Sequence, residues 1–255
     1  MSPSSPPAAP ASVSGDDSAA ATKRALAWTH TARFLTTASK LSELPVSELP
    51  EIAFVGRSNA GKSTAINVLT QQKRLAFASK TPGRTQHINL FEVGPKLAAD
   101  ALFADLPGYG YAAVERSAKL RWQEVMAEYL AVRRSLAAIV VLVDARLGFT
   151  EIDLKLLGFV TPRIVNGAVK LLVLLTKADK LNRSDTAAAL RRANEVLGEL
   201  TSEQADVSLA SFSALSRAGV GDAARVLWGW VHPADGAALQ APVAGDALPA
   251  GMSQS

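Results

Sequence analysis

The stretch that decides the fold is Glu51-Ile-Ala-Phe-Val55 followed directly by Gly56-Arg-Ser-Asn-Ala-Gly61-Lys62-Ser63. The second part fits the pattern G-x-x-x-x-G-K-[ST], a glycine-rich loop that lies between a strand and a helix and cradles phosphate groups. The apolar run before the loop predicts the strand, and Gly61–Thr70, with Ile66 and Leu69 on one side, predicts the helix. A chance match in a chain of this length is roughly a one-in-a-hundred event at average composition. The alternative is a glycine-rich turn that only opens a helix.

Each position of this loop has a chemical reason. The glycines let backbone N–H groups curl round a β-phosphate, and the N-terminus of the following helix adds the positive end of its dipole. Lys62 would reach the β- and γ-phosphates, and the Ser63 hydroxyl would be a ligand of Mg²⁺. Arg57 could contact phosphate, but we expect it to face solvent. The predicted phosphate-binding residues are Gly56, Arg57, Ser58, Asn59, Ala60, Gly61, Lys62 and Ser63.

Outward from the loop, apolar strands alternate with amphipathic helices. This pattern is typical of an α/β fold with three layers, in which a mainly parallel sheet has helices on both faces. Ligands bind at the carboxyl ends of the strands in such folds. Besides Glu51–Val55, the predicted strands are Ile88–Val93, Ala101–Ala104, Leu136–Val143, Leu171–Leu175 and Val207–Phe212, and the predicted further helices are Arg116–Arg134, Asp185–Leu200 and Asp222–Val231.

A second candidate element, Asp105-Leu106-Pro107-Gly108, follows the predicted strand Ala101–Ala104. An aspartate at a strand end can hold a magnesium-bound water, and the N–H of Gly108 can meet a γ-phosphate. The alternative is an aspartate that caps a turn. Because the element follows a phosphate-binding loop by about forty residues, the sequence favours the magnesium interpretation.

A third element, Thr176-Lys177-Ala178-Asp179, closes the predicted strand Leu171–Leu175. The Asp179 carboxylate can accept hydrogen bonds from both N1–H and the exocyclic amine of guanine, a pairing that adenine does not offer. The aliphatic part of Lys177 can lie over the purine. The segment Phe212-Ser213-Ala214 could supply a backbone N–H to guanine O6. The alternative for Asp179 is a helix N-cap.

Composition limits the class of protein. The chain has 255 residues, no cysteine, 48% hydrophobic residues and a formal net charge of +4. These values exclude disulfides and thiol nucleophiles, and they allow a large core. The longest apolar run, Leu136–Val143, is too short to cross a membrane. No positive residue precedes Lys23, which argues against a secretory signal, so we expect a cytoplasmic protein. Pro, Ser and Ala dominate 1–22, and Pro, Ala and Gly dominate 233–255, so we predict two disordered tails around a domain at 23–232.

These motifs, with Lys80-Thr-Pro-Gly-Arg-Thr-Gln86 and Asp105-Leu-Pro-Gly-Tyr-Gly-Tyr111, resemble the EngB family of bacterial GTP-binding proteins, in the TrmE-Era-EngA-EngB-Septin-like class of P-loop GTPases. The resemblance runs from about Phe34 to Val231. It implies a Ras-like G domain, GTP and GDP as ligands, Mg²⁺ as cofactor, and a monomer that acts on a large ribosomal subunit precursor of rRNA and proteins. It also implies a need in normal cell division and septation. The residues that it adds to the site are Gly83, Arg84, Thr85, which would join Mg²⁺ in the GTP state, Gln86 and His87.

The chain departs from the wider class at two positions. Thr176 stands where many GTPases have asparagine, which removes one amide that braces the loops. Tyr109 stands where Ras-like proteins have a glutamine that orients water, so we expect slow hydrolysis. Asn59 matches potassium-activated relatives and could hold K⁺ beside the phosphates, or it could only suit a tight loop. A ribosome-binding module with incidental hydrolysis remains a rival function. A P-loop ATPase or small-molecule kinase is disfavoured by Thr176–Asp179.

Two further interpretations concern helices. The predicted helix Arg116–Arg134 is basic at both ends, and we expect its basic residues to lie on a solvated face rather than to contact ribosomal RNA: Arg116, Lys119, Arg121, Arg133 and Arg134. We expect Trp228 and Trp230, in the last predicted helix, to be packing anchors rather than a stacking platform.

Overall fold

A computed structural model describes residues 15–76, 87–110, 125–200 and 202–233. Its strands form one sheet in the order β1-β3-β4-β2-β5-β6-β7. The β1–β3 and β3–β4 pairs are antiparallel, and the other pairs are parallel. The strands are β1 (Arg33–Ala38), β2 (Glu51–Gly56), β3 (Ile88–Val93), β4 (Ala101–Asp105), β5 (Leu136–Asp144), β6 (Lys170–Thr176) and β7 (Val207–Ser211).

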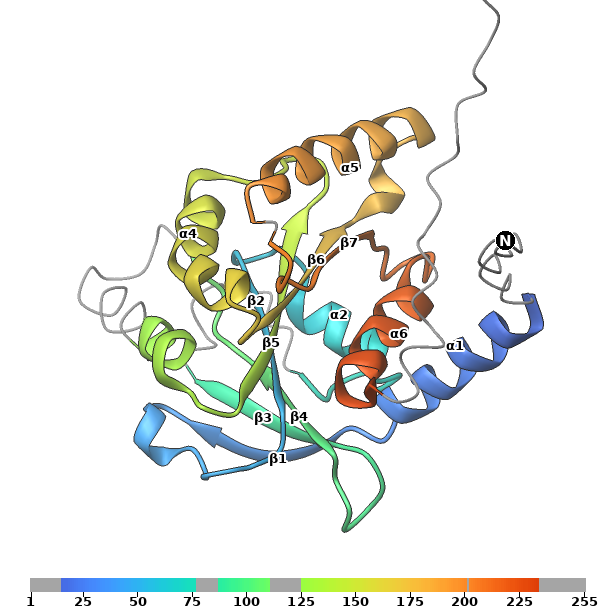
Figure 1. The fold of residues 1–255 in the computed structure, drawn as a ribbon. Coiled ribbons are helices and arrows are strands. Elements are labelled where there is room, and N and C mark those ends of the chain that lie inside the picture. The colour runs from blue at the N-terminus through green and yellow to red at the C-terminus, as the bar shows by residue number, and fades with distance from the viewer. Residues whose placement is uncertain (1–14, 77–86, 111–124, 201, 234–255) are drawn as a thin grey trace, which may run out of the picture.

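Helices cover both faces of this sheet (Figure 1). One face carries α1 (Gly15–Thr29), α2 (Lys62–Leu69) and α6 (Val220–Val231), and the other carries α4 (Glu151–Val165), α5 (Arg183–Gly198) and helical residues 125–132. The predicted three-layer α/β fold is therefore confirmed. None of the described helices is both long enough and apolar enough to cross a bilayer.

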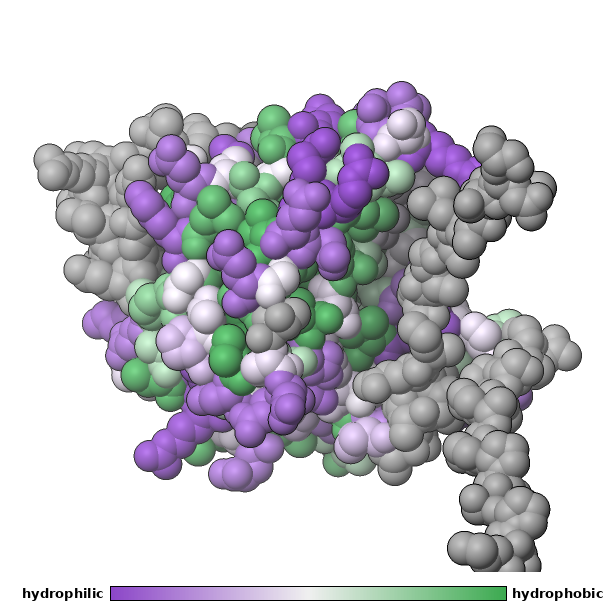
Figure 2. Space-filling model, turned by 45° about the horizontal axis from the view of Figure 1, so that its top comes forward, coloured by the Kyte–Doolittle hydropathy of each residue, from purple (hydrophilic) through white to green (hydrophobic). Residues whose placement is uncertain are grey.

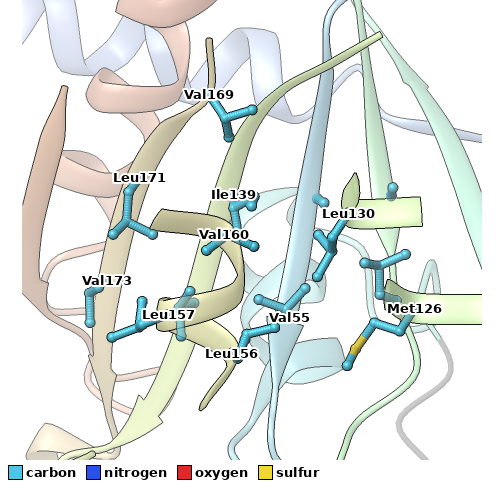
Figure 3. Packing of buried hydrophobic residues seen from close by; sticks show 14 of the residues in the cluster. Val55, Met126, Leu130, Ile139, Leu156, Leu157, Val160, Val169, Leu171 and Val173 are labelled. Carbon is cyan, nitrogen blue, oxygen red and sulfur yellow. The ribbon is translucent and has the colours of Figure 1, made fainter. Parts of the chain in front are cut away.

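The period of two in the central strand builds both halves of the core. In β2, Ile52 and Phe54 pack on the α2 side, while Ala53 and Val55 pack on the α4 side. Figure 3 shows Leu156, Leu157 and Val160 of α4 packed over the central strands of the sheet. Each side chain of the strand is buried, which is the pattern of a parallel strand covered on both faces.

The outer surface of the helices is mixed in character. On the face shown in Figure 2, hydrophilic and hydrophobic side chains are interspersed. Helix α5 explains part of this, because Ala189, Ala193 and Leu197 turn inward while Arg191 and Arg192 are exposed. This is the amphipathic sheet cover predicted for Asp185–Leu200.

The first helix corrects the predicted boundary of the N-terminal tail. The tail was expected to run through residue 22, but α1 begins at Gly15. Alanine has the highest helix propensity, and its small side chain lets two helices approach closely. Ala21, Ala25 and Trp28 are buried, and a Cβ atom at Gly221 of α6 would lie 2.6 Å from Cγ2 of Thr22. The lack of large apolar residues that suggested disorder thus reflects close helix packing.

The sequence analysis did not predict two further elements, β1 and α4. Helix α4 contains Gly158 and Pro162, which are poor helix formers, yet it is well capped at its start. Thr150 and Asp153 form a capping box there, and this pair is the sequence signal that could have identified the helix. Strand β1 has an irregular register between Phe34 and Thr36, which hides its alternation.

The expectation of a solvated face holds for the exposed Arg134 and is wrong for Arg133, while Arg116, Lys119 and Arg121 lie outside the described residues. The Arg133 guanidinium pairs with the fully buried carboxylate of Glu51, which also accepts a 2.6 Å hydrogen bond from the Tyr129 hydroxyl. The helical residues 125–132 are thereby attached to the first residue of β2. Burial and the Glu51 charge raise the pKa of the Tyr129 phenol, so it stays a donor.

Candidate nucleotide-binding site

The predicted site residues meet at one edge of the sheet. Because β2, β4, β5, β6 and β7 run parallel, their carboxyl ends lie side by side. The glycine-rich loop 56–63 follows β2, Asp105 ends β4, Thr176 ends β6, and Phe212 follows β7. This edge is where ligands bind in open α/β sheets.

The loop 56–63 has the backbone of a phosphate cradle. Asn59 and Gly61 both have left-handed conformations, with φ angles of 68° and 94°. A Cβ atom at Gly56 would lie 2.8 Å from the Leu142 carbonyl oxygen, so no larger residue fits without a shift. Helix α2 begins at Lys62, which directs its positive dipole end at the loop.

Lys62 and Asp105 form a buried ion pair. Lys62 is 7% exposed, and Asp105 is fully buried. The second carboxylate oxygen of Asp105, Oδ2, is buried and has no hydrogen-bond partner among the described residues. A buried carboxylate oxygen without a donor suits a metal-bound water. Ser63, the residue after Lys62, lies in the first turn of α2. The residues present therefore fit Mg²⁺.

The segment after β4 packs directly against the loop. The Ser58 N–H donates to the Tyr109 carbonyl at 2.7 Å, and the Tyr109 N–H donates to the Gly56 carbonyl at 3.2 Å. Gly108 lies so close that an added Cβ would be 3.2 Å from the Ser58 backbone. Leu106 is fully buried, and its N–H donates to the Phe54 carbonyl. Asp105, Leu106, Pro107 and Gly108 thus lie against the loop.

The side chain of Tyr109 points into the core. It is 1% exposed, and its hydroxyl donates to Asp153 Oδ1 of α4 at 2.7 Å. Burial, followed by the charge of Asp153, raises the pKa of this phenol, so it remains protonated. The tyrosine in the glutamine position therefore serves packing and a hydrogen bond to α4.

Thr176 braces the loop through its hydroxyl, although it lacks the amide of the asparagine found in many GTPases. Its hydroxyl donates to the Ala60 carbonyl at 2.6 Å and lies 3.1 Å from the Val143 carbonyl. The hydroxyl thus attaches β6 to the loop 56–63, although no amide is present. Its short reach suffices because Thr176 is buried directly behind Ala60.

Lys177 adds a second attachment. Its ammonium group donates to the Asn59 carbonyl at 2.7 Å and to Asp144 Oδ2 at 2.9 Å. The backbone of Lys177 is left-handed, with φ at 57°, which is uncommon for a residue other than glycine. The contacts of its side chain hold this conformation.

Asp179 lies beside the last loop of the site. Its Oδ1 accepts a 2.7 Å hydrogen bond from the hydroxyl of Ser213, and the neighbouring Ala178 N–H donates to the Phe212 carbonyl at 3.2 Å. The bond from Ser213 lowers the pKa of Asp179, so the carboxylate stays ionised. The Ser213 N–H donates to the Ala218 carbonyl, so this donor is already used, and Ala214 is half-buried beside it.

Part of the predicted site lies outside the described residues: Gly83, Arg84, Thr85 and Gln86. His87 is described, is exposed, and shares a 2.8 Å hydrogen bond between its Nδ1 and the Ser39 hydroxyl.

The sequence interpretation missed a group of charged residues around a cavity of about 260 Å³ beside the loop. Arg57, expected to face solvent, is half-buried and lines this cavity. Asp144 lies between Arg146, which it binds through both carboxylate oxygens at 2.9 and 2.7 Å, and Lys177. The hydrogen bonds from Arg146, then those from Lys177, lower the pKa of Asp144. The signal that could have identified Asp144 is its position at the end of β5, where it pairs with Thr176 at the end of β6.

Sequence comparisons point to one group of proteins. A family model described as "50S ribosome-binding GTPase" matches residues 51–177. The "Probable GTP-binding protein EngB" of Acidovorax ebreus is 61% identical over 208 residues, which cover 82% of this chain and 92% of that protein. The protein of the same name from Albidiferax ferrireducens is 59% identical over 214 residues, covering 84% and 100%.

Solved structures agree on the fold. A "probable GTP-binding protein engB" aligns with a TM-score of 0.53 and 20% identity over 72% of this chain and 99% of that one. Era, solved in complex with MgGDPNP and nucleotides of 16S ribosomal RNA, aligns with a TM-score of 0.57 and 21% identity, over 72% of this chain and 57% of its own. At these identities the likeness concerns the arrangement of the sheet and helices.

Proposed function

The chain belongs to the EngB family of P-loop GTPases, and we propose that it is a GTP-dependent switch in assembly of the large ribosomal subunit. GTP hydrolysis is the activity of this family. The observation that carries the nucleotide-binding part of the proposal is the convergence of the Lys62–Asp105 pair and the Asp179–Ser213 pair at one edge of the sheet. One pair suits the phosphate end of a nucleotide and the other suits the guanine end.

At the phosphate end, we assign binding of the β-phosphate to the N–H groups of the loop 56–63 and to Lys62. When GTP binds, the Lys62 ammonium can exchange part of its interaction with Asp105 for the phosphates, because both partners are anionic. Ser63 and Asp105, the latter through water, would hold Mg²⁺, which neutralises charge on the β- and γ-phosphates when bound. Thr85 would join the ion in the GTP state only.

At the guanine end, Asp179 would accept the two guanine donors, and Lys177 would cover the purine face. Ser213 holds the Asp179 carboxylate, and Ala214 would offer its N–H to guanine O6. Gly83, Arg84, Gln86 and His87 complete the proposed nucleotide contacts.

Nucleotide titration tests this assignment. We expect GDP and GTP to bind and ATP not to bind, by fluorescence of labelled nucleotides or by calorimetry. Asp179→Asn should weaken guanine nucleotides and favour xanthine nucleotides, because the new amide can donate to xanthine O2. Lys62→Ala should abolish binding, and Ser63→Ala should reduce chiefly the Mg²⁺-dependent affinity. Equal binding of ATP and GTP by the unchanged protein would refute the guanine assignment.

The ribosomal role has its support in the family-model description and separates into two proposals. In the first, hydrolysis drives release of a cytoplasmic monomer from a precursor of the large subunit, and cell division and septation depend on that step. In the rival, binding of GTP and the particle is sufficient and hydrolysis is incidental. GTP turnover with and without large-subunit particles distinguishes them, since only the first requires stimulation.

Hydrolysis should be slow in the free protein. The Tyr109 hydroxyl is engaged with Asp153, so this position offers no group to orient water. We propose that K⁺, held by the exposed side chain of Asn59, supplies the missing positive charge.

The potassium proposal predicts faster GTP turnover in K⁺ than in Na⁺ at equal ionic strength, with large-subunit particles present. Asn59→Gly should remove the difference while leaving GDP affinity nearly intact, because glycine accepts the left-handed backbone at this position. Identical rates in the two salts would assign Asn59 to the loop conformation alone.

A further inference from the structure

A groove of about 680 Å³ lies between the edge strand β1 and the segment that follows α2. Phe34 of β1 and Asn89 of β3 form one wall, and Lys73, Arg74 and Leu75 form the other. Among the described residues, those lining the groove include none of the proposed nucleotide contacts, so this is a separate surface.

Phe34 presents an aromatic ring to solvent in this groove. It is 59% exposed, whereas seven of the twelve aromatic side chains in the described residues are buried. Its ring centroid lies 6.2 Å from that of Phe91 with an angle of 65° between the planes, so the buried Phe91 supports it from one side. A supported but open ring is a platform on which a flat, unpaired base can stack.

Two neighbouring cations stand across the groove from this ring. Lys73 and Arg74 are exposed, and neither forms an ion pair with a carboxylate in the described ranges of the chain. No acidic residue is among those that line the groove. Arg33, earlier in β1, is by contrast neutralised by Glu92 at 2.8 Å. The uncompensated positive charge therefore lies at the groove, where it favours phosphate groups.

Amide side chains supply hydrogen bonds of both kinds at the same place. The Thr37 hydroxyl donates to Asn89 Oδ1, so the amide N–H₂ of Asn89 remains a donor. Gln72 uses its amide nitrogen on the Ala32 carbonyl, so its oxygen remains an acceptor. An aromatic platform, two cations, an amide donor and an amide acceptor together match a base, its phosphates and its polar edge.

We propose that this groove binds single-stranded RNA, with one base stacked on Phe34 and adjacent phosphates on Lys73 and Arg74. The inference rests on the proposed ribosomal function for the source of the RNA. Single-stranded RNA fits better than a duplex, because bases in a duplex are already stacked and cannot reach the ring.

The test measures binding of fluorescein-labelled oligouridylate and oligoadenylate to the full-length protein by anisotropy, over a series of salt concentrations. Phe34→Ala should weaken binding about tenfold without changing the salt dependence, and Phe34→Tyr should retain the affinity. The double variant Lys73→Ala/Arg74→Ala should lower the slope of log K against log salt by about 1.4, since each phosphate contact on a single strand contributes about 0.7.

The matched control is Arg191→Ala/Arg192→Ala, which removes two adjacent exposed cations on α5 and should leave RNA binding unchanged. GDP affinity should be the same in all variants. The groove assignment would be overturned if RNA binding were absent in the unchanged protein. It would also be overturned if binding were insensitive to Phe34→Ala and to Lys73→Ala/Arg74→Ala.

Co-sedimentation with large-subunit particles is a separate experiment. If the unchanged protein sediments with them while the groove variants bind RNA normally, only the groove assignment fails; if it does not sediment, the ribosomal function fails.

Discussion

Asp144 is the residue on which the nucleotide end of the sheet depends most beyond the motifs themselves. It lies between two cations, and one of them, Lys177, also donates to the backbone of the phosphate loop. Removing the carboxylate would leave the ammonium attached to the Asn59 carbonyl alone and would release the left-handed backbone of Lys177. Asp144 is thus a positioning residue for the side chain proposed to cover the purine.

Asp144→Ala should accordingly weaken GDP and GTP about tenfold, a loss of about 1.4 kcal/mol. The preference for guanine over adenine should persist, because Asp179 keeps its bond to Ser213. Calorimetric titration measures both quantities. Arg146→Ala is the control, since it removes a neighbouring charge but leaves the Asp144–Lys177 contact in place, and it should cost less. Equal losses in the two variants would contradict the positioning role.

At this scale the sequence predicted where the motif residues lie, but it did not predict the side chains and hydrogen bonds that hold them in place. Lys62, Asp105, Thr176 and Asp179 lie together because a motif fixes local geometry at the end of a strand. Asp144 and Arg146 come from the end of β5 and belong to no motif recognised in the sequence, so only the parallel register with β6 brings them to the site. The hydroxyl brace of Thr176 required the distance to Ala60, which a sequence does not contain.

At the scale of elements, α4 is attached to the segment that follows β4. One carboxylate oxygen of Asp153 accepts from the N–H and hydroxyl of Thr150 at the start of α4, and the other accepts from Tyr109. The Gly108–Tyr109 segment, which packs on the phosphate loop, is therefore directly connected to the N-terminus of α4.

Tyr109→Phe should lower the free energy of unfolding by about 2 kcal/mol, because Asp153 Oδ1 loses its donor in a buried setting. It should also change the rate of GTP turnover. Tyr129→Phe is a matched control, since that phenol also donates to a buried carboxylate, Glu51, but at the opposite end of β2. Urea denaturation should show similar losses for both variants, whereas turnover should change only for Tyr109→Phe. A turnover change of the same size in both would remove the proposed link through α4.

The element pattern was predictable wherever a strand was a continuous apolar run. Strands β2, β4, β5 and β6 lie within a residue or two of the expected ranges, because burial on both faces requires such runs. Strands β3 and β7 also lie in the expected ranges, although polar residues interrupt both and β7 is only partly buried. Helix α4 and strand β1 were missed since glycine, proline and an irregular register disguise their periods.

At the scale of the whole molecule, the first and last described helices share one aromatic cluster. The rings of Trp28 of α1 and Trp228 of α6 meet edge to face at 5.7 Å, and His232 stacks on Trp228 at 3.6 Å. Asp100, in the turn between β3 and β4, accepts from the Trp28 indole at 2.8 Å and contacts His232 at 3.0 Å. Trp228, half-buried in this cluster, is a packing anchor, as expected.

Trp28→Ala should reduce the free energy of unfolding by about 3–5 kcal/mol, because it removes a large side chain that is only 4% exposed. Urea denaturation followed by circular dichroism measures the loss. Leu97→Ala, at a residue that is 96% exposed, should have no measurable effect. A small loss in Trp28→Ala would mean that α1 is not part of the cooperative unit.

The contact between α1 and α6 also has a consequence for biosynthesis. A ribosome makes the chain from its N-terminus, so α1 emerges well before α6, whose surface covers it. Until α6 emerges, Trp28 has only part of its partners, and the α2 side of the sheet remains incompletely covered. The nascent chain therefore cannot complete this side of its core until α6 has emerged from the ribosome.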